Sequence, residues 1–173
     1  MKLTLLNRNK YMNSDAPYSP YTVIKAIKTD KKDILRFYKN QQYAASFIGH
    51  DQCYIVKIDQ CIIASVIISA GQEPGNFWLL HGLVTDKTQR GKNIASLIIH
   101  TIISDKNERK QARYKHLICF ADKALQTFYL SNHFTLYNTC NDIAQLPIEF
   151  KQRLIRYRER KKYLHCFRCS VNN

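Results

Sequence analysis

The chain has 173 residues and carries 27 Lys and Arg against 13 Asp and Glu, a formal net charge of +14 that favours anionic ligands. Hydrophobic residues make up 45 % and charged residues 23 %, which is typical of a folded domain and excludes a disordered chain. The longest apolar run, Cys61–Ala70, is shorter than the ~20 residues that a membrane-spanning helix needs, and Leu3–Leu6 is too short for the core of a secretory signal.

The first half of the chain alternates between strand and helix patterns. Residues 1–20 show no periodicity, so we expect an irregular leader before a single domain over residues 21–173. A strand is expected at Tyr21–Ile27 and a helix from Thr29-Asp30 onward. The runs Cys53–Ile58 and Cys61–Ser69 predict a hairpin, and a strand at Phe77–Val84 follows the loop Gly71–Asn76.

The second half opens with the clearest helix. Apolar side chains at Ile94, Leu97, Ile98 and Ile102 follow the spacing of a helix that packs on a core. The remaining expected segments are a basic linker at Lys106–Lys115, a strand at His116–Ala121, a helix at Lys123–Ser131, a strand at Phe134–Thr139, a helix from Pro147 to about Lys162 and a strand at Tyr163–Val171. This order predicts a mixed sheet with helices on both faces, in the α/β or α+β class.

The cysteines do not indicate a metal site. Cys166 and Cys169 form a C-x-x-C pair beside His165, but no second pair has ligand spacing, and zinc needs about four ligands. We interpret the pair as structural and expect no metal. Reduced cysteines in apolar runs agree with a cytoplasmic protein. Because no apolar run is long enough to span a bilayer, we expect no membrane partner.

The turn before the helix at Ile94 has features of an anion site. A helix start leaves about four backbone N–H groups unpaired and carries partial positive charge. Gly91, Ala95 and Ser96 are small enough to let a phosphate approach the backbone, and Arg90 and Lys92 add cations. Taken alone, this segment is also compatible with a solvated turn.

This turn resembles the pyrophosphate loop of the GNAT acetyltransferases, which follows the pattern Arg/Gln-x-x-Gly-x-Gly/Ala between a strand and a helix. The segment from Arg90 to Ala95 matches at the first and sixth positions, whereas Asn93 replaces the glycine at the fourth. Asn is the residue other than Gly that best tolerates a left-handed backbone, so we expect the loop to keep its shape.

A second segment, Asp122–Phe134, resembles the family pattern Asn-x-x-Ala-x-x-Phe-Tyr-x-x-x-Gly-Phe. Phe128, Tyr129 and Phe134 match, Asp122 replaces the Asn and His133 replaces the Gly. The two motifs stand in the expected order, so the chain is identified as a suspected member of the GNAT family. The resemblance implies a mostly antiparallel central sheet flanked by helices, the acyl-CoA N-acyltransferase fold.

The resemblance also implies an activity, the transfer of an acetyl group from acetyl-CoA directly to a primary amine. The strand ending at Leu83-Val84 would splay from the strand His116–Phe120, and its backbone would hold the pantetheine arm. The residues implied to bind the coenzyme are Leu83, Val84, Gln89, Arg90, Gly91, Lys92, Asn93, Ile94, Ala95, Ser96, Asp122 and Phe128.

Two residues are candidates for proton transfer. Tyr129 takes the position of the family's general acid, which protonates the departing thiolate; the alternative is a residue that packs its helix on the sheet. In some family members a carboxylate near the position of Leu79 acts as the general base. The apolar side chain of Leu79 cannot take this role. His81 lies two residues on, on the same sheet face, and is the candidate base; the alternative is a half-buried histidine bonded to a backbone carbonyl.

The acceptor remains open. The segment Lys151–Lys162 carries seven cations and one carboxylate, which fits a solvated helix face or an acceptor with negative charge, including a nucleic-acid-linked one. A small molecule or a peptide with an amine, including a polyamine, an aminoglycoside or an amino sugar, fits the same loop, in a monomer or a homodimer. The alternative functions are an inactive coenzyme-binding or regulatory module and a basic RNA-binding protein.

Overall fold

The computed structural model of the chain describes residues 19–44, 51–72, 77–105 and 114–170. The strands are β1 (Val23–Lys25), β2 (Gln52–Ile58), β3 (Cys61–Ala70), β4 (Phe77–Thr85), β5 (His116–Asp122), β6 (Thr135–Leu136) and β7 (Leu164–Ser170). The α-helices are α1 (Lys31–Asn40), α2 (Ile94–Ser104), α4 (Gln126–Ser131), α5 (Cys140–Ala144) and α6 (Ile148–Arg160). The 3-10 helices are η1 (Lys28–Asp30), η2 (Lys87–Gln89) and η3 (Lys123–Leu125).

The strands form one sheet in the order β1-β2-β3-β4-β5-β7-β6. Neighbouring strands are antiparallel except for β4 and β5, which run parallel. The mixed, mostly antiparallel sheet predicted from the sequence is confirmed. Among the residues that the structure describes, no helix has the length and apolar character of a membrane span.

Several predicted bounds differ from the observed ones. β1 and β6 are shorter than predicted, and the helix predicted at 123–131 divides into η3 and α4. Helix α5 was missed: Thr139 accepts a hydrogen bond from the N–H of Asp142, whose carboxylate accepts the N–H of Thr139, so a capping box starts a helix too short to show periodicity. Most of the predicted leader, part of the loop 71–76 and most of the basic linker fall at residues 1–18, 73–76 and 106–113, outside the described residues.

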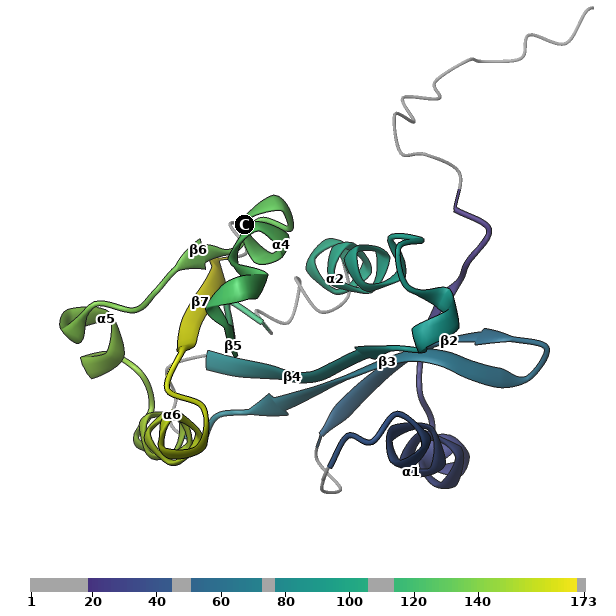
Figure 1. The fold of residues 1–173 in the computed structure, drawn as a ribbon, viewed down its shortest axis with the longest axis horizontal. Coiled ribbons are helices and arrows are strands. Elements are labelled where there is room, and N and C mark those ends of the chain that lie inside the picture. The colour runs from purple at the N-terminus through teal and green to yellow at the C-terminus, as the bar shows by residue number, and fades with distance from the viewer. Residues whose placement is uncertain (1–18, 45–50, 73–76, 106–113, 171–173) are drawn as a thin grey trace, which may run out of the picture.

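Helices cover both faces of the sheet, α2 and α4 on one side and α1 and α6 on the other (Figure 1). Alternate strand residues point to opposite faces. Leu80 and Cys119 therefore pack in the core beneath α2 and α4, while Leu79 and Ile118 pack against α6. Burial on both faces explains why these strands are continuously apolar rather than alternating.

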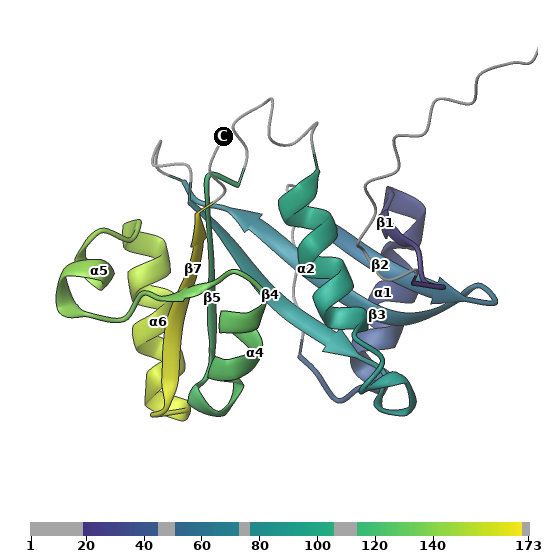
Figure 2. The ribbon, with the colours of Figure 1, turned by 90° about the horizontal axis from the view of Figure 1, so that it is seen from above.

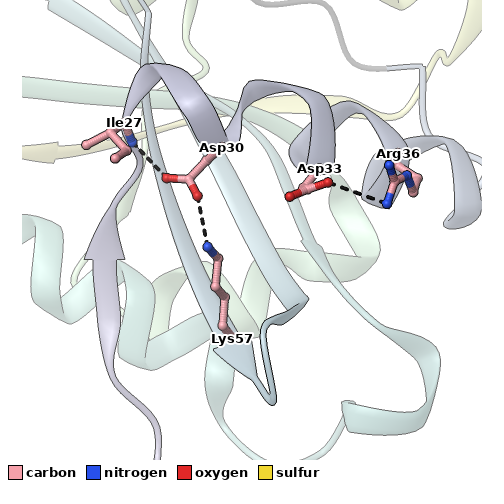
Figure 3. A network of polar contacts seen from close by, with 5 residues as sticks. All are labelled: Ile27, Asp30, Asp33, Arg36 and Lys57. Carbon is pink, nitrogen blue, oxygen red and sulfur yellow. Dashed lines mark hydrogen bonds and ion pairs between the residues drawn. The ribbon is translucent and has the colours of Figure 1, made fainter.

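A polar network fixes the start of α1 against the sheet (Figure 3). One carboxylate oxygen of Asp30 accepts the N–H of Ile27 at 2.9 Å, and the other accepts Lys57 Nζ from β2 at 2.8 Å. The hydrogen bond from Lys57, followed by that from Ile27, lowers the pKa of Asp30. These contacts hold α1 over β2 and β3, where Ile34, Phe37 and Tyr38 lie buried.

Strand β4 carries a bulge near its carboxyl end. Ser65 of β3 is paired with Val84, but Ile67 is paired with His81, so β4 contains one extra residue between these pairs. Gly82 lies in the bulge with a φ of +60°, and its carbonyl accepts a hydrogen bond from the buried Tyr38 hydroxyl at 2.7 Å. The glycine is required here, because an added Cβ would be strained by this φ and would lie 3.2 Å from the Tyr38 hydroxyl.

Candidate active site

The candidate active site lies where β4 and β5 separate. Their parallel pairing begins at Phe77 and His116 and ends at Leu80 and Cys119, although β4 continues to Thr85 and β5 to Asp122. The two strands diverge toward their carboxyl ends (Figure 2). The predicted splay of β4 from β5 is therefore observed. The bulge at Gly82 lies in the part of β4 that is paired with β3 but no longer with β5.

A cavity of about 520 Å³ occupies this gap. From β4 it is lined by Leu79, Leu80, His81, Gly82 and Leu83; from β5 by Phe120, Ala121 and Asp122; and from the surrounding elements by Gln42, Tyr43, Ala44, Leu125, Tyr129, Tyr157, Arg160, Lys161 and Leu164. Tyr129 belongs to the core on the α2 and α4 face, whereas Tyr157 comes from α6. The cavity therefore connects the two faces of the sheet.

The turn between β4 and α2 exposes unpaired backbone donors. Gly91 has a φ of +78° and Asn93 a φ of +57°, so the residue that replaces the family's glycine does adopt the left-handed conformation. Asn93 is the N-cap of α2 but makes no side-chain cap hydrogen bond, and the first turn contains no acidic residue. The start of α2 is consequently open to an anion.

Side chains in this turn are held by local contacts. Arg90 Nε donates to the carbonyl of Thr85 at 3.3 Å, and Lys92 Nζ donates to Gln89 Oε1 at 2.8 Å. Both cations are exposed and lie within the turn, which adds to its positive potential. No atom of the described residues lies within 4 Å of a Cβ placed on Gly91, so the backbone is accessible there.

Of the other residues predicted to bind the coenzyme, some line the cavity and others pack in the core. Leu83 lines the cavity, and so does Asp122, whose carboxylate accepts the N–H of Ala124 at 2.9 Å and caps η3. Val84 packs toward α1 instead, and Phe128 packs on the α2-face core. Ile94 is 1 % exposed, while Ala95 and Ser96 are half-buried in the first turn of α2.

Tyr129 is buried among aromatic rings at the edge of the cavity. Its ring stacks on Phe167 at 5.1 Å and meets Phe128 and Phe134 edge-on. Burial raises its pKa well above 10, and the neighbouring Cys119 thiol adds to this rise. The hydroxyl therefore stays protonated at neutral pH and can donate a proton within the gap. Packing and proton donation, the two roles considered from the sequence, are both compatible with this position.

His81 lines the same cavity from the opposite face of the sheet. It is half-buried, and its Nε2 lies 2.9 Å from the Ser69 hydroxyl rather than being bonded to a backbone carbonyl. Burial, reinforced by the positive charge of Arg153, lowers its pKa to about 4, while Asp51 acts in the opposite direction. The imidazole is consequently neutral at physiological pH.

Sequence reasoning missed residues that reach the cavity from distant segments. Tyr43 lines the cavity, and Ser69 contacts His81 at its edge, but neither belongs to a motif. The glycine inside the apolar strand β4 was a usable signal for the bulge, because an isolated glycine in a strand often marks one. Ser69 offered no signal, since its role depends on the β3–β4 register.

The charge and shape of the site suit an elongated anionic ligand. An open helix start with adjacent cations suits a pyrophosphate, and the partly apolar gap suits an extended arm. Within the described ranges there is no group of three or more His, Cys, Asp or Glu residues that could hold a metal ion.

Comparisons with known proteins agree with this geometry. The model of the acetyltransferase (GNAT) family matches residues 16–134. No curated protein sequence matches the chain. Among solved structures, N-acetylglutamate synthase from Neisseria gonorrhoeae, in complex with coenzyme A and N-acetyl-glutamate, is similar with a TM-score of 0.64 and 12 % identity over 91 % of this chain; the chain spans only 37 % of that protein.

Two further structures are similar over most of their own length. A GNAT-family acetyltransferase from Staphylococcus aureus has a TM-score of 0.60 and 15 % identity, covering 88 % of this chain and 99 % of its own. Glucosamine-6-phosphate N-acetyltransferase from Arabidopsis thaliana has a TM-score of 0.51 and 12 % identity, covering 66 % of this chain and 90 % of its own. At these identities the structures support the fold, and the family model extends over more than half of the chain. The chain therefore belongs to the GNAT acetyltransferase family.

Proposed function

We propose that the protein transfers an acetyl group from acetyl-CoA directly to a primary amine. The observation that carries this proposal is the gap between β4 and β5, which opens beside the uncapped start of α2. Related support comes from the structure of N-acetylglutamate synthase, which contains coenzyme A.

The turn at residues 89–96 would bind the coenzyme's pyrophosphate. N–H groups at the start of α2 donate to its oxygens, and the left-handed Gly91 and Asn93 keep the backbone accessible. Arg90 and Lys92 neutralise charge from the exposed side. Leu83 and the unpaired edge of β4 face the gap in which the pantetheine arm would extend.

Acetyl-CoA supplies a thioester carbonyl carbon as the electrophile. The neutral amine forms the new C–N bond as the C–S bond breaks, and the sulfur leaves with the electron pair. Tyr129 donates its phenolic proton toward that sulfur from the edge of the cavity. Burial raises the pKa of Tyr129, and a thiolate in the same apolar gap is also destabilised, so a hydrogen bond between them lowers the cost of departure.

His81 would accept the proton lost by the amine. It is neutral above its pKa of about 4 and lines the gap on the face opposite to α2. A base with this pKa cannot deprotonate an ammonium ion efficiently. The reaction therefore requires that the amine bind in its neutral form. The pH dependence between pH 5 and 8 would then follow the ionisation of the acceptor rather than that of His81.

Direct attack is favoured over an acyl-enzyme on cysteine. Cys119, which interacts with Tyr129, is 1 % exposed, and burial raises its pKa well above 9. A buried neutral thiol is a poor nucleophile. The acetyl group would therefore pass directly to the amine, without an acyl-enzyme on Cys119.

Thermal unfolding with and without acetyl-CoA tests the coenzyme half of the proposal. A ligand at ~100 times its Kd stabilises a protein by ~2.7 kcal/mol. At ~2–4 °C per kcal/mol, Tm should rise by roughly 5–10 °C. Sulfate at matched ionic strength is the control for anion binding; an equal rise with sulfate, or none at millimolar acetyl-CoA, would refute the coenzyme site.

Release of the CoA thiol in the presence of primary amines tests the transfer half. The rival function, a coenzyme-binding module without catalysis, predicts the Tm rise but no amine-dependent thiol release. Amine-dependent release together with an acetylated amine product would exclude that rival.

A further inference from the structure

A second cavity, of about 560 Å³, lies on the α6 side of the sheet and continues from the first. The two share Tyr43, Ala44, His81, Tyr157 and Arg160. It is further lined by Asp51, Ser69, Ala70, Gln72, Glu149, Phe150, Arg153, Arg156 and Glu159. A cavity of this size holds a small molecule or the end of a chain. Since His81 stands at the junction, this second cavity is where an acceptor would approach the thioester.

One face of α6 brings positive charge to this cavity. Arg153, Arg156 and Arg160 follow helical spacing and all line it. Arg153 is half-buried, and none of the three makes a hydrogen bond or an ion pair within the described part of the chain. Other cations of the helix face elsewhere and are engaged: Arg158 donates to the carbonyl of Leu164 and to Asn138 Oδ1, and Lys151 donates to the carbonyl of Ala144.

Glu149 and Glu159 form no ion pair with the arginines in the described part of the chain. Glu149 Oε1 accepts the N–H of Gln72 at 2.6 Å, Glu159 is exposed and Asp51 is engaged in a contact of its own. Glu149 Oε2 is buried without a partner among the described residues, one helical turn from Arg153. It offers an acceptor for an N–H group of a bound molecule.

The guanidinium of Arg153 also acts electrostatically on His81. Its positive charge is the second cause, after burial, of the low pKa of the imidazole. An anion bound to Arg153 would offset this charge and make His81 a stronger base. A substrate with an anionic group would therefore pair with the guanidinium of Arg153. By raising the basicity of His81, it would also favour the loss of a proton from its own amine.

We propose that the acceptor is an amine that carries an anionic group, a carboxylate or a phosphate, and that Arg153 binds this group while the amine lies at His81. The inference rests on the proposed acetyl transfer and adds the class of acceptor. A guanidinium binds either anion through two parallel hydrogen bonds, so both belong to one chemistry.

Matched pairs of amines test the proposal by steady-state thiol release. Each of several α-amino acids is compared with its own carboxamide, and phosphoethanolamine is compared with ethanolamine. We expect kcat/KM to be about tenfold or more higher for the charged member of at least one kind of pair, as a charge-assisted hydrogen bond allows. A preference within the amino acid pairs indicates a site for a carboxylate, and a preference within the phosphoethanolamine pair indicates a site for a phosphate.

Variants assign the preference to a residue. Arg153→Gln should reduce the ratio within the preferred pair to about threefold or less, whereas Arg153→Lys should keep a substantial part of it, because the charge remains. Lys162→Gln is the matched control: it removes one exposed cation that lines neither cavity and should leave the ratio unchanged. The rise in Tm that acetyl-CoA produces, measured by thermal unfolding, should be the same in all of these variants.

Two results would overturn the proposal. One is a wild-type protein that acetylates neutral amines as well as or better than their charged partners. The other is a preference that survives Arg153→Gln. If no amine is acetylated, saturation-transfer NMR measures binding of the same pairs of amines to the CoA complex without turnover. The proposal is rejected if the charged amines give no signal, or a signal equal to that of their neutral partners. CoA binding measured alongside shows separately whether the coenzyme site holds.

Discussion

The two halves of the candidate site are built in different ways. The turn proposed to bind the coenzyme's pyrophosphate comes from one continuous stretch, the end of β4, the turn and the start of α2, and it offers mainly backbone N–H groups. The cavity proposed to take the acceptor combines side chains from β3, β4 and α6 and offers a histidine and arginines. Backbone donors tolerate substitution, as Asn93 illustrates, whereas side-chain contacts change with every substitution. We therefore expect coenzyme binding to persist through changes that alter the acceptor.

Tyr129→Phe should give the largest effect and separates chemistry from coenzyme binding. Loss of a positioned general acid lowers kcat by roughly 10²–10⁴-fold. Coenzyme affinity should change little, because the aromatic packing remains. Steady-state thiol release and a calorimetric titration with acetyl-CoA measure the two quantities.

Tyr137→Phe is the matched control for this experiment. Tyr137 is also buried, but its hydroxyl donates to Gln145 Oε1 at 2.8 Å, in the core beneath α6. Its loss should leave kcat close to that of the wild type. Unchanged turnover in Tyr129→Phe would remove Tyr129 from the mechanism and leave it a packing role.

His81 should make stability depend on pH on the acceptor side. Its pKa is about 4 in the folded state against 6.5 in the unfolded chain, so the unfolded state binds more protons between these values. The free energy of unfolding should therefore fall as pH drops from about 6.5 to 4, by up to about 3 kcal/mol. His81→Gln keeps a hydrogen-bonding group near Ser69 and should lack this contribution.

Urea unfolding of the wild type and His81→Gln at pH 7, 5.5 and 4.5 checks this dependence. The difference in unfolding free energy between the two proteins should shift in favour of the variant as pH falls. A constant difference across the three values would show that His81 is not held neutral by its surroundings.

Gly82 and Gly91 allow a smaller, direct comparison of the bulge with the turn. Both have positive φ, so alanine is strained at either position by about 1 kcal/mol. At Gly82 the new Cβ would also meet the Tyr38 hydroxyl at 3.2 Å, whereas at Gly91 no atom in the described ranges lies within 4 Å. Gly82→Ala should therefore lower the unfolding free energy by about 2–3 kcal/mol and Gly91→Ala by about 1 kcal/mol. Equal losses in urea unfolding would contradict the described packing of the bulge.

The same contrast explains what could be predicted from the sequence. The element order follows from local patterns, because hydrophobic periodicity acts over a few residues. The splay and the left-handed Asn93 were expected from the resemblance to the GNAT family, since no local pattern predicts where two strands separate. The pairing of His81 with Ser69 and the approach of Arg153 depend on strand register and on how α6 packs. Helix α5 was missed because a helix of five residues has too few turns to show a periodic pattern.

The central claim is that the coenzyme binds at the start of α2 beside the gap between β4 and β5. Amide hydrogen exchange tests it directly, because N–H groups without intrahelical partners exchange rapidly until a ligand accepts them. We predict that acetyl-CoA, but not sulfate at equal ionic strength, slows exchange in residues 85–98 and 119–130 and leaves α1 unchanged. Protection confined to other segments, or the same protection with sulfate, would contradict the account.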